Sequence, residues 1–145
     1  MRGTEGEEVK NEVELRLPSL PENVALARLL VAGLAGQLPF TLQEMEEIKV
    51  AVSEAVTNCV VHAYPDRPGP VQVTGRVRDG VLEVEVEDWG RGMEDVEKAR
   101  EPSYSTLPDH LGLGFAFMEN FMDGVEVWSE PGRGTRVRMW KKSSK

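Results

Sequence analysis

The chain is poor in the residues that form covalent or metal cross-links. It holds one cysteine, Cys59, and two histidines among 145 residues. An intramolecular disulfide and a metal site built from several cysteines are therefore excluded. Cys59 lies in an apolar, helix-like stretch, so we expect it to pack in the core and not to act as a reactive thiol. Long apolar runs are also missing, because none approaches the roughly 20 residues that cross a bilayer.

Basic charge is scarce as well. Seventeen lysines and arginines stand against 25 aspartates and glutamates, which gives a net charge of −8. This balance argues against broad binding to a nucleic-acid backbone, which needs a basic surface, although it would suit a basic partner protein. The first ten residues, MRGTEGEEVK, lack the apolar centre of a secretory signal, so we expect a cytoplasmic protein.

The length fits one domain that can bury a full core. We expect this domain to span residues 11–140, with flexible tails at 1–10 and 141–145. Alternating apolar and charged residues predict a strand at 13–17. Two capping-box spacings predict the helices that follow. The first pairs Ser19 with Glu22 and opens a helix to about Gln37, and the second pairs Thr41 with Glu44 and opens a long helix to about His62.

The second half of the chain alternates in the manner of strands around one more helix. An Asp79-Gly80 pair between two such runs is a strong hairpin signal. The predicted elements are strands at 71–78, 81–87, 125–128 and 136–140 and a helix at 114–121. Residues 93–111 form a long polar segment, and such loops are usually functional or mobile. This order predicts an α+β two-layer sandwich, with three helices on one face of a mixed, mainly antiparallel sheet.

Three polar residues interrupt the apolar second helix. Glu54, Asn58 and His62 are spaced four apart and so lie along one line of the helix. They form either a solvated face or the polar wall of a pocket, because an unpaired carboxylate or amide among apolar residues is costly. In a pocket, an amide oxygen suits Mg²⁺ and a carboxylate one turn away suits a general base. His62 fits a hydrogen bond at the helix end better than metal ligation.

Two glycine turns follow further along the chain. Residues 88–92, with the sequence DWGRG, close a strand, and their glycines let a ligand approach the backbone. Asp88 is placed to accept a hydrogen bond from an exocyclic amine, although this motif alone fits a plain surface turn equally well. Residues 112–114, GLG, open a helix whose unpaired N–H groups favour phosphate. The P-loop lysine motif and the dinucleotide fingerprint are both missing.

These segments together resemble a known family. Residues 52–64 resemble the N box of the GHKL (Bergerat-type) ATP-binding fold, residues 88–92 its first glycine box and residues 112–114 its second. Gly134-Thr135 resembles its last nucleotide element. Within that superfamily the chain is most similar to the anti-sigma factor serine kinases of the sporulation sigma-F switch, through residues 21–28 and 114–123. The resemblance covers roughly residues 11–140.

The resemblance implies a cytoplasmic homodimer that binds sigma-F and uses ATP to phosphorylate one serine of an anti-anti-sigma protein. By position, Glu54 would activate the substrate hydroxyl, Asn58 would bind Mg²⁺ and Asp88 would read the adenine amino group. Arg28 would contact the partners, and residues 93–111 would form a lid over ATP or ADP. The further nucleotide contacts that the resemblance implies are Gly90, Gly92, Met93, Thr106, Gly112, Gly114, Phe115 and Thr135.

The lid departs from the pattern of these relatives and leaves alternatives open. Leu107 stands where a lysine is usual, and His110 and Leu111 stand near the place of an arginine. One alternative is a module that binds ATP and sequesters the sigma factor without phosphotransfer. Others are the related general-stress anti-sigma kinase and a detached sensor histidine-kinase catalytic domain, although the sequence contains no phosphoacceptor helix.

Overall fold

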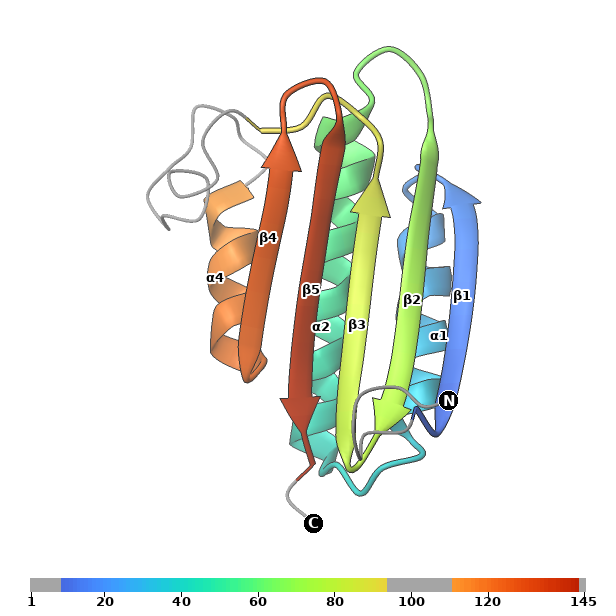
Figure 1. Cartoon of the computed structure of the whole chain (residues 1–145), viewed down its shortest axis with the longest axis vertical. Helices are drawn as coiled ribbons and strands as arrows, with labels where there is room; N and C mark the ends of the chain where they lie inside the picture. Colours follow the sequence, from blue (N-terminus) through green and yellow to red (C-terminus); the bar gives the residue numbers. More distant parts are fainter. Residues whose placement is uncertain (1–8, 94–110, 144–145) are drawn as a thin grey trace.

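The computed structural model describes residues 9–93 and 111–143. Within these residues, strands form one sheet in the order β1-β2-β3-β5-β4, and the helices cover one of its faces (Figure 1). The strands are β1 (Asn11–Pro18), β2 (Pro70–Arg78), β3 (Val81–Asp88), β4 (Gly124–Glu130) and β5 (Gly134–Lys142). The helices are α1 (Asn23–Ala35), α2 (Leu42–Asn58) and α4 (Leu111–Phe121), and the short π-helix η1 (Cys59–Ala63) continues α2.

This arrangement is the predicted two-layer α+β sandwich. The sheet that we expected to be mixed and mainly antiparallel is antiparallel at each pairing of the described strands. Successive side chains of each strand point to opposite faces of the sheet, so the apolar residues face the helices and the charged residues face away from them. On β3, Leu82, Val84 and Val86 are buried beneath the helices. Ile48, Val52 and Val56 of α2, spaced four apart, are fully buried in the same core.

One of the two predicted capping boxes is present. The Thr41 hydroxyl accepts a hydrogen bond from the Glu44 N–H at 3.1 Å, and the Glu44 carboxylate accepts one from the Thr41 N–H at 2.8 Å. The prediction for Ser19 is wrong, because α1 begins at Asn23 and no side chain caps it. The Ser19 hydroxyl instead accepts the Gly69 N–H at 3.0 Å. A contact between distant segments has therefore taken the role that a local cap would have had.

The predicted hairpin turn is confirmed. Asp79 and Gly80 both have positive φ, 46° and 77°, as a two-residue hairpin turn requires. At the C-terminal end β5 continues to Lys142, and Ser143 is buried and donates its N–H to the Gly80 carbonyl at 2.8 Å. Residues 141–143, which we expected in a flexible tail, are therefore part of the fold. No helix among the described residues is long and apolar enough to span a membrane.

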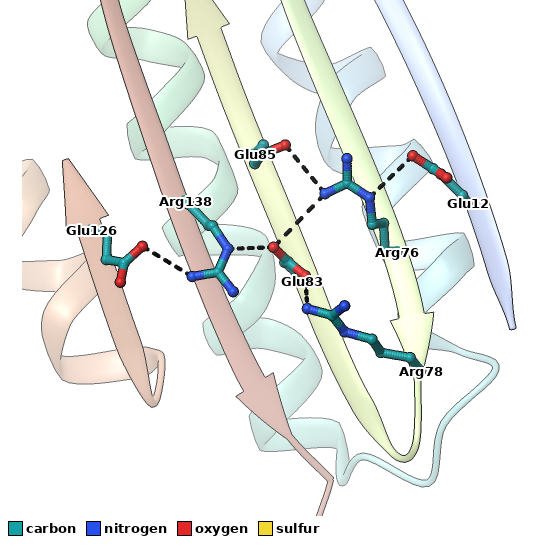
Figure 2. Close-up of polar contacts among 7 residues, drawn as sticks. All are labelled: Glu12, Arg76, Arg78, Glu83, Glu85, Glu126 and Arg138. Carbon is teal, nitrogen blue, oxygen red and sulfur yellow. Dashed lines mark hydrogen bonds and ion pairs between the residues drawn. The ribbon is translucent and has the colours of Figure 1, made fainter. Parts of the chain in front are cut away.

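A row of charged side chains crosses the open face of the sheet (Figure 2). Glu83 of β3 lies at its centre, with its side chain only 5% exposed. It pairs with Arg78 at 2.6 Å, with Arg138 of β5, and with Arg76 of β2 at 3.7 Å. The row reaches Glu12 on β1 and Glu126 on β4, which pair with Arg76 and Arg138 at 3.0 Å each. It therefore links all five strands of the described sheet.

Candidate nucleotide site

The two predicted polar residues of α2 lie against the first turns of α4. A Cβ atom added at Gly114 would lie 3.0 Å from Oε1 of Glu54 and 3.6 and 3.7 Å from Nδ2 and Oδ1 of Asn58. A glycine at this point lets α4 approach the two side chains closely. The polar line of α2 is therefore the wall of an interhelical contact and not a solvated face. The second glycine turn and the N box, which are far apart in sequence, meet here.

The Asn58 amide has hydrogen-bonding capacity to spare. Its Nδ2 atom is buried and has no hydrogen-bond partner within the described part of the chain. A buried donor without a partner costs about 1–3 kcal/mol. Such an atom is typical of a site that a ligand completes. The finding fits the predicted place of Asn58 in a nucleotide site, where the amide N–H would donate to an acceptor atom of the ligand; a cation would use the Oδ1 atom instead.

Asp88 is the last residue of β3 and lies beside Cys59 of η1, with 5% of its surface exposed. Its Oδ1 accepts the Gly90 N–H at 2.9 Å. Burial raises the pKa of the Asp88 carboxyl, and hydrogen bonds from the Gly90 N–H, the Cys59 thiol and the Thr135 N–H oppose that rise. Thr135 pairs directly with Asp88 in the β3–β5 register. The structure thus joins two predicted site residues that the sequence separates widely.

Cys59 lies beneath Asp88 and is buried, as we expected. Burial, followed by the charge of Asp88, raises the pKa of the Cys59 thiol well above its ordinary value. A thiol held neutral in this way is a poor nucleophile. Its place in the core is confirmed.

The glycines of the first turn serve contacts with the protein's own backbone. A Cβ at Gly90 would collide with the carbonyl of Ala63, and the neighbouring Arg91 donates its N–H to the same carbonyl at 2.9 Å. Gly92 has a φ of +72°, and a Cβ there would collide with the carbonyl of Glu130. Their missing side chains therefore let the turn pack on η1 and on the β4–β5 turn. We had expected them to make room for a ligand.

Ser129 of β4 belongs to the site, and our sequence reasoning missed it. Its hydroxyl accepts the Met93 N–H at 2.8 Å and lies 2.8 Å from the Thr135 hydroxyl and 3.0 Å from the Gly134 carbonyl. It therefore fixes the end of the first glycine turn against β5. Its inward position among Val125 and Val127 on the alternating β4 is a signal that could have revealed it.

The remaining predicted residues are placed as follows. Gly112 lies in the first turn of α4. The Phe115 side chain is 1% exposed and packs in the core, and its contact with a nucleotide stays a prediction. Thr106 and residues 94–110 of the expected lid lie outside the described residues. Arg28 lies apart from this site on α1. Its Nη1 donates to the Ser53 hydroxyl at 3.2 Å, and the residue is half-buried.

The comparison with protein families identifies the class. The family described as histidine kinase-like ATPase domain matches residues 17–141. The chain therefore belongs to that family of nucleotide-binding domains.

Curated relatives make the assignment narrower. A protein named anti-sigma F factor from Caldanaerobacter subterraneus is 46% identical over 136 residues, which are 92% of this chain and 95% of the relative. One of the same name from Clostridium acetobutylicum is 44% identical over an equal span with the same coverage. A third, from Oceanobacillus iheyensis, is 44% identical over 140 residues, 94% of this chain and 96% of the relative. The chain belongs to the family of anti-sigma F factors, and the resemblance found in the sequence is confirmed.

Solved structures share the fold at lower identity. A Mycobacterium tuberculosis protein with RsbU and RsbW domains gives a TM-score of 0.67 at 17% identity, over 92% of this chain and 32% of that one. The histidine kinase domain of a blue-light activated kinase from Erythrobacter litoralis gives 0.56 at 23% identity, over 88% and 62%. At these identities the likeness supports the fold alone.

Proposed function

We propose that this chain is an anti-sigma factor that binds sigma-F and an ATP-dependent serine kinase that inactivates an anti-anti-sigma protein. The first activity is supported by the names of relatives that match nearly the whole chain. The second is supported by one observation above all. Glu54 and Asn58 meet Gly114 near the start of α4, so the residues that we assign as base and cation ligand lie beside the helix end that we assign to the phosphates.

Adenine recognition falls to Asp88 in this proposal. Its carboxylate lies at the end of β3, and a carboxylate is a strong acceptor for an exocyclic amine. The Thr135 N–H donates to the Asp88 carboxyl, and the Ser129 hydroxyl holds the backbone N–H of Met93 nearby. The phosphates would lie toward the N-terminal turn of α4, which includes Gly112 and Gly114, because unpaired N–H groups and the helix dipole favour anions there.

Asn58 is the residue that we assign to Mg²⁺. No group of three or more histidine, cysteine, aspartate or glutamate residues in the described segments is arranged to hold a metal. Mg²⁺ usually keeps several waters and binds through few protein oxygens together with substrate phosphates. The single amide oxygen of Asn58, beside the turn that we assign to the phosphates, is consistent with this coordination of Mg²⁺.

The transfer step then needs little from the protein beyond position and charge. ATP would supply the phosphoryl group, and a cation held by Asn58 would offset its negative charge. Glu54 accepts the proton of the substrate serine hydroxyl while the serine oxygen bonds to the terminal phosphorus of ATP, the bond from that phosphorus to ADP breaks, and ADP leaves. The half-buried position of Glu54 against α4 holds its carboxylate in place for this role.

The proposal includes a homodimer and a partner contact at Arg28, both from the family resemblance. The alternative is a module that binds ATP and sequesters sigma-F without phosphotransfer, and Leu107 in the expected lid favours it. Incubation with labelled ATP, Mg²⁺ and the cognate anti-anti-sigma protein separates the two. Label on a serine of the partner supports the kinase. Binding of sigma-F and ADP without any transfer would support the sequestering module instead. Comparing affinities for purified sigma-F and a general-stress sigma factor tests the choice of partner.

A further inference from the structure

Tyr64, which follows η1, joins the start of β2 to the first glycine turn. Its hydroxyl donates to the Pro70 carbonyl at 2.6 Å and accepts the Trp89 N–H at 2.9 Å. Pro70 is the first residue of β2, and Trp89 follows the last residue of the neighbouring strand β3. Both lie at the end of the sheet that carries Asp88. One phenol group therefore fixes the backbone on both sides of this end of the sheet.

The tyrosine ring is itself held in place. A Cβ atom at Gly69 would collide with the ring, so the ring lies directly on the glycine backbone. Gly69 is anchored in turn by Ser19, whose hydroxyl accepts the Gly69 N–H at 3.0 Å and whose N–H donates to the Gly69 carbonyl at 2.8 Å. Both its surroundings and its hydrogen bonds restrict the position of the hydroxyl.

The amide that Tyr64 holds is next to Asp88. The Trp89 N–H belongs to the peptide unit that begins with the carbonyl carbon of Asp88, so fixing it restricts the backbone that carries the carboxylate. On the far side of Trp89, the Gly90 N–H donates to Asp88 Oδ1 at 2.9 Å. The Trp89 indole points to the surface, where it is 42% exposed and Arg16 lies 5.0 Å from the ring centroid. Tyr64 thus holds the turn through its backbone.

We infer that Tyr64 is a positioning residue for adenine recognition, acting through the orientation of Asp88. The inference rests on the adenine-reading role proposed above for that carboxylate. Without the hydroxyl, the Trp89 N–H and the Pro70 carbonyl each lose a partner, and the turn gains freedom. Nucleotide binding must then reorder the carboxylate, and that ordering lowers affinity. The loss falls on ligands that use the carboxylate, so selectivity for the adenine amine falls with it.

The test compares ADP with inosine diphosphate, which carries an oxo group in place of the amine. Calorimetry with Mg²⁺ gives both dissociation constants for the wild type, Tyr64→Phe and Ser19→Ala. The serine variant is the matched control, because it removes one hydrogen bond from the same linker and none to Trp89, while the Ser19 N–H still anchors the Gly69 carbonyl. Tyr64→Phe is expected to raise the dissociation constant of ADP about fivefold to tenfold, and that of inosine diphosphate by less than about twofold. Ser19→Ala is expected to leave both within about twofold.

A second variant moves the hydroxyl without removing it. Gly69→Ala pushes the ring away. Like Tyr64→Phe, it is expected to weaken the binding of ADP more than the binding of inosine diphosphate. Unchanged ADP affinity in Tyr64→Phe would overturn the inference. So would equal losses for both nucleotides, or equal losses in Tyr64→Phe and Ser19→Ala, because each indicates general loosening of the linker. If the wild type itself does not prefer ADP, the role of Asp88 is wrong and the inference falls with it.

Discussion

Gly114 of α4 lies so close to Glu54 of α2 that a methyl group on the glycine would be 3.0 Å from the carboxylate oxygen Oε1. Contacts this short require a neighbour to move, and the end of the Glu54 side chain is the part that can. The spacing of these two residues therefore controls where the proposed base stands.

Gly114→Ala is expected to slow phosphotransfer by about 10- to 100-fold, because small misplacements of reacting groups carry losses of that size. The fold should not suffer, since alanine is favoured over glycine inside a helix by about 1 kcal/mol. Transfer rates and urea unfolding on the same preparation check both statements. A variant that is both less stable and slower would point to damaged packing of α4 instead.

Glu54→Gln separates chemistry from binding. The amide keeps the size of the side chain but cannot accept the serine proton, so transfer is expected to fall by about 10²–10⁴-fold. ADP affinity should stay near that of the wild type. Glu46→Gln is a matched control on the same helix, because Glu46 is exposed and pairs only with Lys49 at 2.8 Å among the described residues. Transfer at the normal rate in Glu54→Gln would place the base elsewhere.

Asp88→Asn is expected to weaken ADP binding by about tenfold to a hundredfold, because an amide can set a donor against the adenine amine. Isothermal calorimetry measures this change directly. Unchanged ADP affinity would remove Asp88 from the adenine site.

The raised pKa of Asp88 also sets a direction for stability against pH. Burial raises the pKa of this carboxyl above the ordinary 3.8. Between 3.8 and the raised pKa, the folded state holds more protons at Asp88 than the unfolded state does. The contribution of Asp88 to stability is therefore fully present below 3.8 and is lost as pH rises through the folded pKa. Unfolding free energies of the wild type relative to Asp88→Asn should fall across that window. A difference that rises or stays flat would contradict the burial effect.

Much of this fold could be predicted because burial imposes a period on the sequence. Alternation located β2 and β3, and the three- and four-residue spacing of apolar side chains located α2. The Thr41 cap was predictable because both of its hydrogen bonds are local. Ser19 has the same sequence spacing, but its hydroxyl bonds to Gly69, 50 residues away. A local pattern contains no information about that partner.

The site could be predicted only in part, for the same reason. The helical period placed Glu54 and Asn58 on one line, but their meeting with Gly114 depends on how α4 packs against α2. Asp88 and Thr135 meet because β3 pairs with β5 and not with β4, a choice of sheet order that no local period encodes. The contact of Gly90 with a nucleotide stays a prediction, and the sequence did not indicate that its missing side chain faces η1.

The open face of the sheet offers a test of stability away from the site. Glu83→Gln leaves three arginines around a neutral amide, and removing one partner of a buried ion pair commonly costs several kcal/mol. Because the arginine side chains are 25–32% exposed, we expect a smaller loss, about 2 kcal/mol. Glu126→Gln is the control, since Glu126 pairs with the same Arg138 but is 66% exposed, and should change stability by less than about 1 kcal/mol. Equal effects in urea unfolding would show that burial of Glu83 contributes nothing special.

Arg28→Ala is expected to weaken sigma-F binding by at least about tenfold, because an arginine in a desolvated interface can contribute 2 kcal/mol or more. Arg28→Glu should weaken it further, since charge reversal adds repulsion. The structure adds a control, because the guanidinium also donates to the Ser53 hydroxyl at 3.2 Å. Ser53→Ala removes that hydrogen bond and keeps the positive charge, so it should bind sigma-F with nearly wild-type affinity. Titration of labelled sigma-F compares all four proteins. If Ser53→Ala loses as much affinity as Arg28→Ala, the arginine acts by holding α1 against α2 and not by contacting the partner. Equal affinities for the wild type, Arg28→Ala and Arg28→Glu would exclude Arg28 from the interface.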